Sequence, residues 1–370
     1  MNDIFVDLIA NGQAQGQVAQ MILNNGRMDT GRMRPFIGRD GRAYMTVYKG
    51  GDPRKPESYA VIQSYAGATL RRDEWKRLDE AIVEPSRYRL GGVEDLISNG
   101  LVYNLGNGLG TTVLEWHDVS EGMNAVVTMD GVTRGNNDRV VFQHNYLPLP
   151  IIHADYEINA RVLAASRNMG NPLDTTMAER AARRILELKE NMLFTDVTYS
   201  YGETDTRGRN TIYSYINFPD RNLVNLSIPW DNSACTGKMI LQDVLEMKQA
   251  SLTALHYGPW MLYIPAAYET VLDDDYVGAN PDTAPTVTVR QRLLGIAGIK
   301  GIKVIDTLPA NNVLLVQMTS DVVRLVRGMA LQNVEWKTEG NMVTKYKVMT
   351  IEVPQIRSDI NGKCGIVHMS

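Results

Sequence analysis

The stretch that decides the fold runs from Asn145 to Asp196 and reads NYLPLPIIHADYEINARVLAASRNMGNPLDTTMAERAARRILELKENMLFTD. It begins with a short apolar strand, continues through a polar hinge and ends in one long, charged, amphipathic helix. Thr176 stands three residues before Glu179, which is the spacing of a capping box at a helix start. We expect this helix over residues 177–193, roughly 25 Å long at 1.5 Å per residue.

The predicted helix has one narrow apolar face. Apolar residues recur at steps of three and four, which places on the same side Met177, Ala181, Ile185, Leu188 and Met192. Charged residues, including Lys189 and Glu190, cover the remainder. We therefore expect the helix to pack on one side only. Taken alone, that pattern fits an ordinary surface helix of a globular domain equally well.

The bulk composition indicates a folded protein. The 370 residues suffice for two domains or one elaborate one, and apolar and charged contents of 44% and 22% are ordinary. A formal net charge of −4 argues against a general polyanion binder. Cys235 and Cys364 are far apart, which favours a reduced, intracellular protein over a disulfide scaffold. No secretory signal and no membrane-spanning apolar run is visible, so we expect folding in a cytoplasm.

The N-terminal 68 residues differ from the rest of the chain. Weak periodicity predicts an arm over residues 1–68 that packs on something else. Eight basic residues lie between positions 27 and 55, namely Arg27, Arg32, Arg34, Arg39, Arg42, Lys49, Arg54 and Lys55. Only Asp29, Asp40 and Asp52 oppose them there, so this stretch carries an excess of five positive charges (8 − 3).

Downstream of the arm, apolar spacing predicts a helix that opens at Thr69 and ends before Pro85. Its buried face is formed by Leu70, Trp75, Leu78 and Ile82. The glycine-rich stretch from Gly91 to Thr112 is expected to be a loop. Residues 111–146 alternate apolar and polar side chains around several turn signals, which is typical of a long, projecting β-ribbon.

The second half of the chain reads as a smaller α/β unit followed by strands. A helix is predicted over residues 236–255, with a buried face of Leu241, Leu245, Leu252 and Leu255. Strands and short helices then alternate over residues 258–328, in a βαβ-like order that marks a compact domain. Residues 331–370 are β-rich, and 343–353 is their clearest strand.

No pattern of chemical groups recommends an active site or a metal site. The five histidines are His117, His144, His153, His256 and His368. None has the HExxH or helical-pair spacing of metal ligands. Gly106, Gly108 and Gly110 lack the spacing of a phosphate loop and precede a strand, which favours a flexible hinge. We expect no catalytic residue, no metal and no cofactor.

Four segments, taken in order, resemble the major capsid proteins of tailed bacteriophages with the Hong Kong 97 fold, which include the related bacterial encapsulins. The helix from Thr69, TLRRDEWKRLDEA, is similar to the family's first peripheral-domain helix. Residues 111–146 stand where the family has its extended loop. The LPLP stretch from Leu147 to Pro150, with the helix at 177–193, looks like the strand and spine helix. Residues 313–370 are similar to the final apical strand and the closing peripheral strands.

The resemblance implies an α+β chain with the Hong Kong 97-type capsid fold: an N-terminal arm, an extended β-loop, a peripheral domain with a long spine helix, and an apical domain. The implied divisions are 1–68 for the N-terminal arm, 69–110 for the first part of the peripheral domain, 111–146 for the extended loop, 147–257 for the peripheral domain with the spine helix at 177–193, 258–328 for the apical domain and 329–370 for the closing peripheral strands. The five apolar residues of the spine helix are then expected to pack it against the peripheral domain.

The resemblance also implies a function. The chain is expected to be a major capsid protein that self-assembles into pentamers and hexamers of an icosahedral shell around a double-stranded DNA phage genome. The virion would be assembled in the host cytoplasm, without a membrane. Expected partners are further copies of the chain and, by non-specific contacts, the packaged DNA, with room for portal, scaffold and cement proteins. Two alternatives stay open: an encapsulin shell that houses an enzyme cargo, and a cytoplasmic α/β enzyme.

The basic excess of the arm leads to a separate hypothesis. We expect Arg32, Arg34, Arg39 and Arg42 to face the lumen of the shell and to meet phosphate by sequence-independent contacts. An equally open alternative is that these arginines pair with acidic side chains of neighbouring subunits, because arginine favours ion pairs at interfaces.

The lysine distribution bears on how the shell is held together. Some capsids of this family join subunits by an isopeptide bond between a lysine on the extended loop and an asparagine of a neighbour. No lysine occurs between Lys76 and Lys189, and therefore none in residues 111–146. Arg134 and Arg139 stay protonated and are poor nucleophiles. We therefore predict non-covalent contacts, or separate cement proteins, between subunits.

Overall fold

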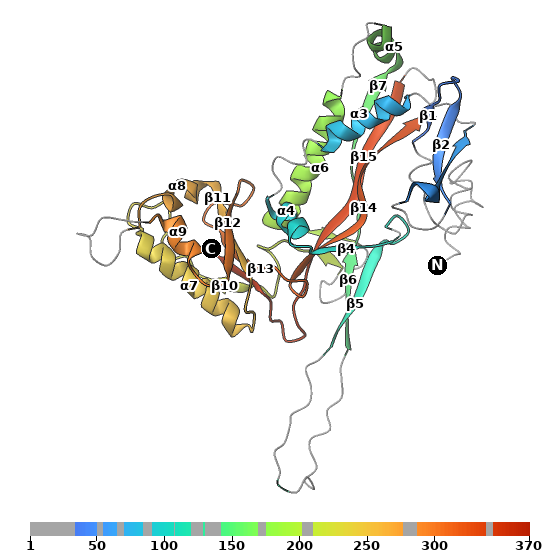
Figure 1. The fold of residues 1–370 in the computed structure, drawn as a ribbon. Helices are drawn as coiled ribbons and strands as arrows, with labels where there is room; N and C mark the ends of the chain where they lie inside the picture. Colours follow the sequence, from blue (N-terminus) through green and yellow to red (C-terminus); the bar gives the residue numbers. More distant parts are fainter. Residues whose placement is uncertain are drawn as a thin grey trace.

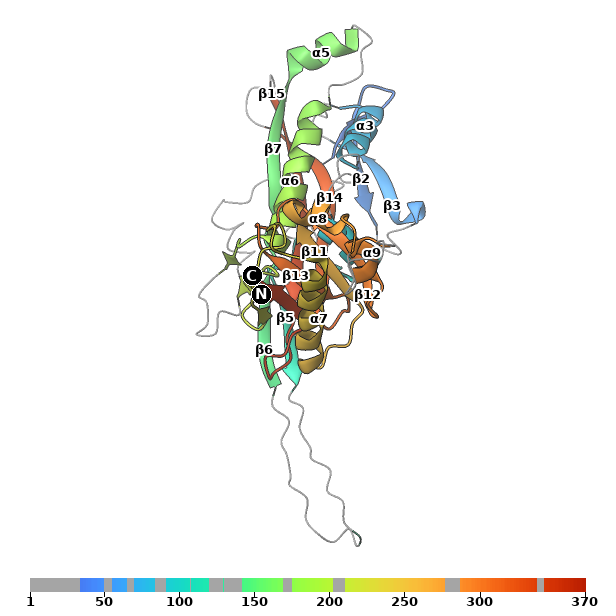
Figure 2. The ribbon, with the colours of Figure 1, turned by 90° about the vertical axis from the view of Figure 1, so that its left-hand side faces the viewer.

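The computed structural model shows an elongated body, a smaller lobe at its side, and a two-stranded ribbon that leaves the body at one end (Figures 1 and 2). The body and the lobe are each built on a sheet, of four and five strands. The structure describes residues 34–49, 55–64, 70–83, 91–106, 108–119, 129, 142–168, 175–201, 210–276, 287–337 and 343–370.

The body is organised around the sheet β4-β14-β15-β7. The long antiparallel pair β14 (Val323–Lys337) and β15 (Val343–Ile356) forms its centre. β4 (Val102–Asn104) runs parallel to β14, and β7 (Ile152–Asn159) runs antiparallel to β15. Buried residues alternate at the start of β15 and then become continuous from Val348. This change is expected where a sheet passes from one covered face to two.

Two long helices lie on this sheet in the body. α3 (Arg72–Val83) and α6 (Thr176–Phe194) contact each other, and α6 also contacts β7 and β15 (Figure 1). The predicted buried face around α3 is confirmed, because all four of its residues are buried: Leu70, Trp75, Leu78 and Ile82. None of the helices in the described part of the chain is long and apolar enough to cross a membrane.

Two helices stand where the sequence predicted irregular structure. α5 (Ala160–Asn168) replaces part of the expected polar hinge, and α4 (Gly91–Ser98) replaces the start of the expected glycine-rich loop. The glycine at position 92 serves close packing, because a Cβ there would lie 2.3 Å from the Phe194 ring. The prediction of a loop is wrong over α4, because glycine here allows a helix to approach its neighbour closely.

The expected hinge glycines are likewise in contact with the sheet. A Cβ on Gly108 would lie 2.2 Å from the backbone of Gly328, which belongs to β14. The Leu105 N–H donates to the Arg327 carbonyl oxygen. Gly108 thus permits a backbone-to-backbone approach, and the prediction of a flexible hinge is wrong at this residue.

The arm and the ribbon form small sheets of their own. The arm sheet has the order β1-β2-β3, and the ribbon pairs β5 with β6, while β8 and β9 form a third short pair. Their bounds are Phe36–Ile37 for β1, Ala43–Tyr48 for β2, Tyr59–Gln63 for β3 after the 3-10 turn η2 (Pro56–Ser58), Val113–Val119 for β5, Phe142–Pro148 for β6, Tyr199–Ser200 for β8 and Thr211–Ile212 for β9. Most of the ribbon predicted between residues 119 and 142 lies outside the described residues.

The lobe is an α/β unit with the strand order β10-β16-β13-β11-β12. The strands are Asn222–Val224 (β10), Trp260–Pro265 (β11), Ile299–Ile305 (β12), Val313–Gln317 (β13) and Ile366–Met369 (β16). The helices are α7 (Gly237–Thr253), α8 (Glu269–Leu272) after the 3-10 turn η4 (Ala266–Tyr268), and α9 (Val289–Leu294). The lobe therefore includes β10, α7 and β16, which lie outside the compact domain predicted over residues 258–328.

The predicted buried face of α7 is also corrected. Its buried side chains are Ile240, Val244, Met247 and Ser251, at steps of four, three and four. Leu245 and Leu255 of the predicted face are exposed, and Leu241 and Leu252 only flank the core. α7 carries two adjacent apolar rows, and spacing alone does not decide which of them meets the sheet.

Candidate functional site

Of the five residues predicted to pack the long helix α6, three are buried and two are exposed. Ala181, Ile185 and Met192 are buried, whereas Met177 and Leu188 remain 47% and 42% exposed. The buried set also contains Ala178, Ala182, Leu186, Lys189, Glu190, Leu193 and Phe194. The packed face is wider and turned relative to the prediction because α3 and α4 cover the helix in addition to β7 and β15.

The start of α6 differs from the predicted capping box. Thr175, not Thr176, precedes the helix, and it makes no side-chain hydrogen bond to the backbone of the first turn. Its hydroxyl donates instead to the Glu179 carboxylate at 2.7 Å. The sequence predicted that Thr176 and Glu179 interact through the backbone of the first turn. The structure has Thr175 in place of Thr176, and its side chain bonds directly to the Glu179 side chain.

A buried ionic network fastens α6 to the central strands. The Lys189 ammonium lies 2.5 Å from one carboxylate oxygen of Glu352 on β15, and both side chains are nearly fully buried. The Arg327 guanidinium on β14 donates to the other oxygen of the same carboxylate. A buried carboxylate is tolerated when both oxygens are paired in this way. Lys189 was predicted on the polar face, and its position four residues after the buried Ile185 is the sequence feature that indicates burial.

A second buried carboxylate lies where α6 meets the lobe. Glu190 accepts a hydrogen bond from the Gly92 N–H at 3.1 Å, at the start of α4. Asp95 of α4 accepts from the Tyr263 hydroxyl of β11 at 2.9 Å and pairs with Lys303 of β12 at 2.6 Å. Burial, opposed by backbone N–H groups, raises the pKa of Glu190 to about 7.

The arm sheet is attached to α3 through Arg34. Its guanidinium donates to both carboxylate oxygens of Asp79, at 2.6 and 2.7 Å, and lies 4.7 Å from the centre of the Trp75 ring. The Trp75 indole N–H donates to the Pro35 carbonyl at 3.0 Å. Arg34 therefore holds the arm to its own chain, which neither sequence hypothesis for this residue foresaw.

Arg39 and Arg42 take no part in the pair between Arg34 and Asp79. Arg39 and Arg42 are exposed on the turn between β1 and β2, and Arg42 lies 3.9 Å from Asp40. Arg32 falls outside the described residues. Their proposed contact with phosphate stays a prediction.

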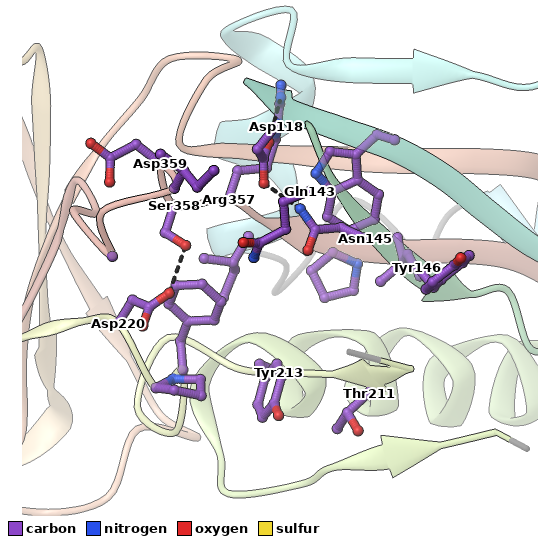
Figure 3. Close-up of a pocket in the computed structure, with 18 residues that line it drawn as sticks. Asp118, Gln143, Asn145, Tyr146, Thr211, Tyr213, Asp220, Arg357, Ser358 and Asp359 are labelled. Carbon is purple, nitrogen blue, oxygen red and sulfur yellow. Dashed lines mark hydrogen bonds and ion pairs between the residues drawn. The ribbon is translucent and has the colours of Figure 1, made fainter. Parts of the chain in front are cut away.

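A pocket of about 300 Å³ opens at the foot of the ribbon (Figure 3). Its walls come from β5 and β6, from residues 211–220 and from residues 354–362. Asn145 donates to Asp118, the Arg357 guanidinium lies 3.7 Å from that carboxylate, and Ser358 donates to Asp220 at 2.6 Å. Among the described residues, no histidine or lysine lines the pocket, and its ionisable groups are three aspartates, one arginine and two tyrosines.

Burial shifts the pKa values of both cysteines and of one histidine. Burial raises the pKa of the Cys364 thiol to about 12, and burial also raises the pKa of Cys235. Burial and the nearby Arg221 lower the pKa of His368 to about 4, and its Nε2 lies 2.6 Å from Asn312 Oδ1. Within the described ranges, no group of three or more His, Cys, Asp or Glu side chains could hold a metal ion.

Residues 65–369 match a protein family described as "Family of unknown function (DUF6260)". The chain belongs to this family. The match spans the body, the ribbon and the lobe, and it begins after the arm sheet that ends at Gln63.

Two solved structures show which fold this family has. The virus-like particle from Pyrococcus furiosus is 18% identical, with a TM-score of 0.55, over 80% of this chain and 99% of that one. The capsid of Myoviridae phage XM1 is 10% identical, with a TM-score of 0.55, over 74% and 90% of the two chains. The α+β chain therefore has the Hong Kong 97-type capsid fold, as the sequence resemblance implied.

A curated relative points to the same class. The type 1 encapsulin shell protein EncA of Myxococcus xanthus (strain DK1622) is 29% identical over 151 residues, which are 40% of this chain. The chain spans about half the length of this relative, 50%, in the matched region. These proteins are a virus-like particle, a phage capsid and an encapsulin shell protein, and the DUF6260 chain shares the fold of such shells.

Proposed function

We propose that the chain is the major capsid protein of a tailed bacteriophage, which self-assembles into pentamers and hexamers of an icosahedral shell around double-stranded DNA. The observation that carries the proposal is the fold, which matches a virus-like particle over 99% of that particle's chain and a phage capsid over 90% of the capsid chain. A shared fold suggests a function but does not establish it. A capsid protein must also have surfaces that can bind other subunits.

Exposed apolar side chains on outlying elements support assembly. Val61 on β3, Phe142 on β6 and Val162 on α5 are all exposed. β3 belongs to the arm sheet, and α5 lies at the end of the body opposite the ribbon (Figure 2). Apolar side chains exposed on thin projections gain most from burial against another subunit, at about 25 cal/mol per Å² removed from water. We assign these projections to contacts between subunits.

The proposed domains follow the two sheets. The body corresponds to the peripheral domain with α6 as spine helix, the ribbon to the extended loop, and the lobe to the apical domain. The apical domain would then include β10, α7 and β16 in addition to residues 258–328. Residues 1–68 remain the proposed arm.

The proposed partners are other copies of the chain and the packaged DNA, through non-specific phosphate contacts. Portal, scaffold and cement proteins complete the set that a tailed phage requires. The shell would assemble in the host cytoplasm and persist in the virion.

A second candidate function is an encapsulin shell that houses an enzyme cargo. The 29% identity to the Myxococcus xanthus shell protein favours it. The arm favours the phage capsid, because residues 1–64 precede the family match and encapsulins usually carry shorter arms. The content of the lumen distinguishes the two: a DNA genome or a cargo protein.

Electron microscopy of the purified full-length chain tests the proposal. Hollow shells with pentamers and hexamers are expected, formed by the chain alone or together with a scaffold protein. Particles isolated from an infected host should contain DNA. A monomer or dimer that persists at high concentration, with no particles recovered from the host, would contradict any shell function. Particles with a protein cargo and no genome would favour the encapsulin.

A further inference from the structure

An open groove lies between the arm sheet and α3. It encloses about 1260 Å³ and is lined by residues 34–46 and 71–79 of the described chain. Five cationic side chains line it, namely Arg34, Arg39, Arg71, Arg72 and Lys76. Two carboxylates, Asp73 and Asp79, oppose them, which leaves an excess of three positive charges (5 − 2). This excess contrasts with the net charge of −4 for the whole chain.

One of these cations, Arg34, already forms an ion pair within the chain. Arg34 is paired with both oxygens of Asp79 and stacked on Trp75, so this pair is neutral and structural. Four cations then face a single carboxylate, Asp73, and the excess is still three (4 − 1). The charge available to a ligand therefore resides on the turn between β1 and β2 and on the first turns of α3.

The remaining cations are accessible. Arg39, Arg71, Arg72 and Lys76 are all exposed. Among the described residues, no ion pair is seen for the guanidinium groups of Arg39, Arg71 and Arg72, although the Arg71 backbone N–H donates to the Glu74 carboxylate at 2.8 Å. Lys76 lies 3.7 Å from the exposed Glu80. Exposed pairs of that kind contribute little, so they compete weakly with an anionic ligand. Arg72 and Lys76 are one helical turn apart, about 6 Å along α3.

The lining chemistry favours phosphate over an acidic polypeptide. Arg34 covers the buried Trp75, and the Arg72 guanidinium lies 5.8 Å from the Phe36 ring centre. Cations therefore stand beside both rings, while Phe36 and Ile37 keep part of their surface open to the groove. Guanidinium groups match phosphate oxygens in geometry, and double-stranded DNA presents one charge per ~1.7 Å of its axis.

We propose that this groove binds the phosphodiester backbone of double-stranded DNA, through sequence-independent contacts from Arg39, Arg71, Arg72 and Lys76. The inference rests on the proposed function, because a capsid meets DNA in its lumen. It changes the set of contact residues suggested by the sequence: Arg34 and Arg42 are removed, Arg39 is kept, and three residues of the α3 segment are added. Arg32 lies outside the described residues.

The test compares two variants of the full-length, unassembled chain that lose the same charge. The groove variant carries Arg39→Gln, Arg72→Gln and Lys76→Gln. The matched control carries Arg180→Gln, Arg183→Gln and Arg184→Gln on the exposed face of α6. Fluorescence anisotropy measures binding of two short labelled DNA duplexes of unrelated sequence over a range of salt concentrations.

The wild-type chain should bind both duplexes equally. The groove variant should bind about tenfold more weakly at low salt, and its slope of log K against log salt should be smaller by about 2 to 3, because each phosphate contact contributes about 0.9. The control should keep the wild-type slope. Formaldehyde crosslinking of wild-type chain to DNA gives a measurement that needs no variant: the link should map to Lys76.

Three results would overturn the inference: wild-type binding by the groove variant, an equal loss in the control variant, or displacement of DNA by poly-glutamate at equal charge concentration. The last would assign the groove to an acidic polypeptide. If the groove variant does not fold, crosslinks found only outside residues 34–83 decide against the groove.

Electron microscopy separates the two proposals. Shells formed by a chain that does not bind DNA would refute only the proposed DNA-binding groove. DNA binding by a chain that forms no shells would refute only the proposed capsid function.

Discussion

At the scale of single residues, the buried ion pair between Lys189 of α6 and Glu352 of β15 contributes to the stability of the fold. Lys189→Met removes the ammonium from Glu352 and leaves a buried carboxylate with Arg327 as its remaining partner. We expect the free energy of unfolding to fall by about 3 kcal/mol, the range for breaking a buried pair. Urea unfolding of the unassembled chain measures it. The double variant Lys189→Met, Glu352→Leu should recover part of the loss, and Arg183→Met on the exposed face should change little.

Glu190 gives the junction between body and lobe a dependence on pH. Its folded pKa of about 7 exceeds the ordinary value of 4.5, so the folded chain binds more protons between these two values. The free energy of unfolding should therefore fall as pH rises from about 4.5 to about 7, by up to about 3 kcal/mol, and then level off. Acidification should stabilise this contact, in contrast to an ordinary surface carboxylate.

Glu190→Gln tests this dependence, because glutamine keeps the acceptor for the Gly92 N–H and removes the charge. The variant should be more stable than the wild type at pH 8 and similar to it at pH 5. Glu187→Gln on the exposed side of α6 is the control, and it should leave the pH profile of the wild type in place. Parallel pH profiles for Glu190→Gln and wild type would refute the role of Glu190.

At the scale of elements, the arm sheet is held on α3 by few contacts, and Arg34 is the central one. Arg34→Gln removes the two hydrogen bonds to Asp79 and the stacking on Trp75. Because both side chains are partly exposed, we expect the free energy that holds the arm sheet on α3 to fall by about 1 kcal/mol. The population of chains with a detached arm should then rise roughly fivefold. Chymotrypsin should then cleave at Phe36, Tyr44 and Tyr48 about fivefold faster. Arg39→Gln, which leaves the Asp79 pair intact, should be cleaved at the wild-type rate.

At the scale of the whole molecule, the shell is expected to be held together without covalent links through the ribbon. No lysine occurs between Lys76 and Lys189, so no ribbon lysine can form an isopeptide bond. Mature particles boiled in detergent should release one band at the chain mass of 41.3 kDa. A ladder of multimers, with mass spectrometry placing a link within residues 111–146, would contradict this expectation.

The sequence predicted the elements whose pattern is long and strongly periodic. α3, and α6 to within one residue at each end, appear where spacing placed them. The strand predicted over residues 343–353 lies within β15. The sequence failed at α4 and α5, where glycine or mixed polarity hid short helices. Local pattern is weakest where tertiary contacts stabilise an element that its own residues barely favour.

What the sequence determined by itself was the fold family, the basic arm and the absence of lysine in the ribbon. Each depends only on residue order. What only the tertiary structure decided was which apolar row of α7 is buried, that β10 and β16 complete the sheet of the lobe, and that Lys189 and Glu190 lie inside. It also decided that Arg34 is paired with Asp79 while Arg72 and Lys76 face a groove. The physical reason is that burial and charge pairing depend on segments brought together from distant positions, and spacing along the chain carries no record of these contacts.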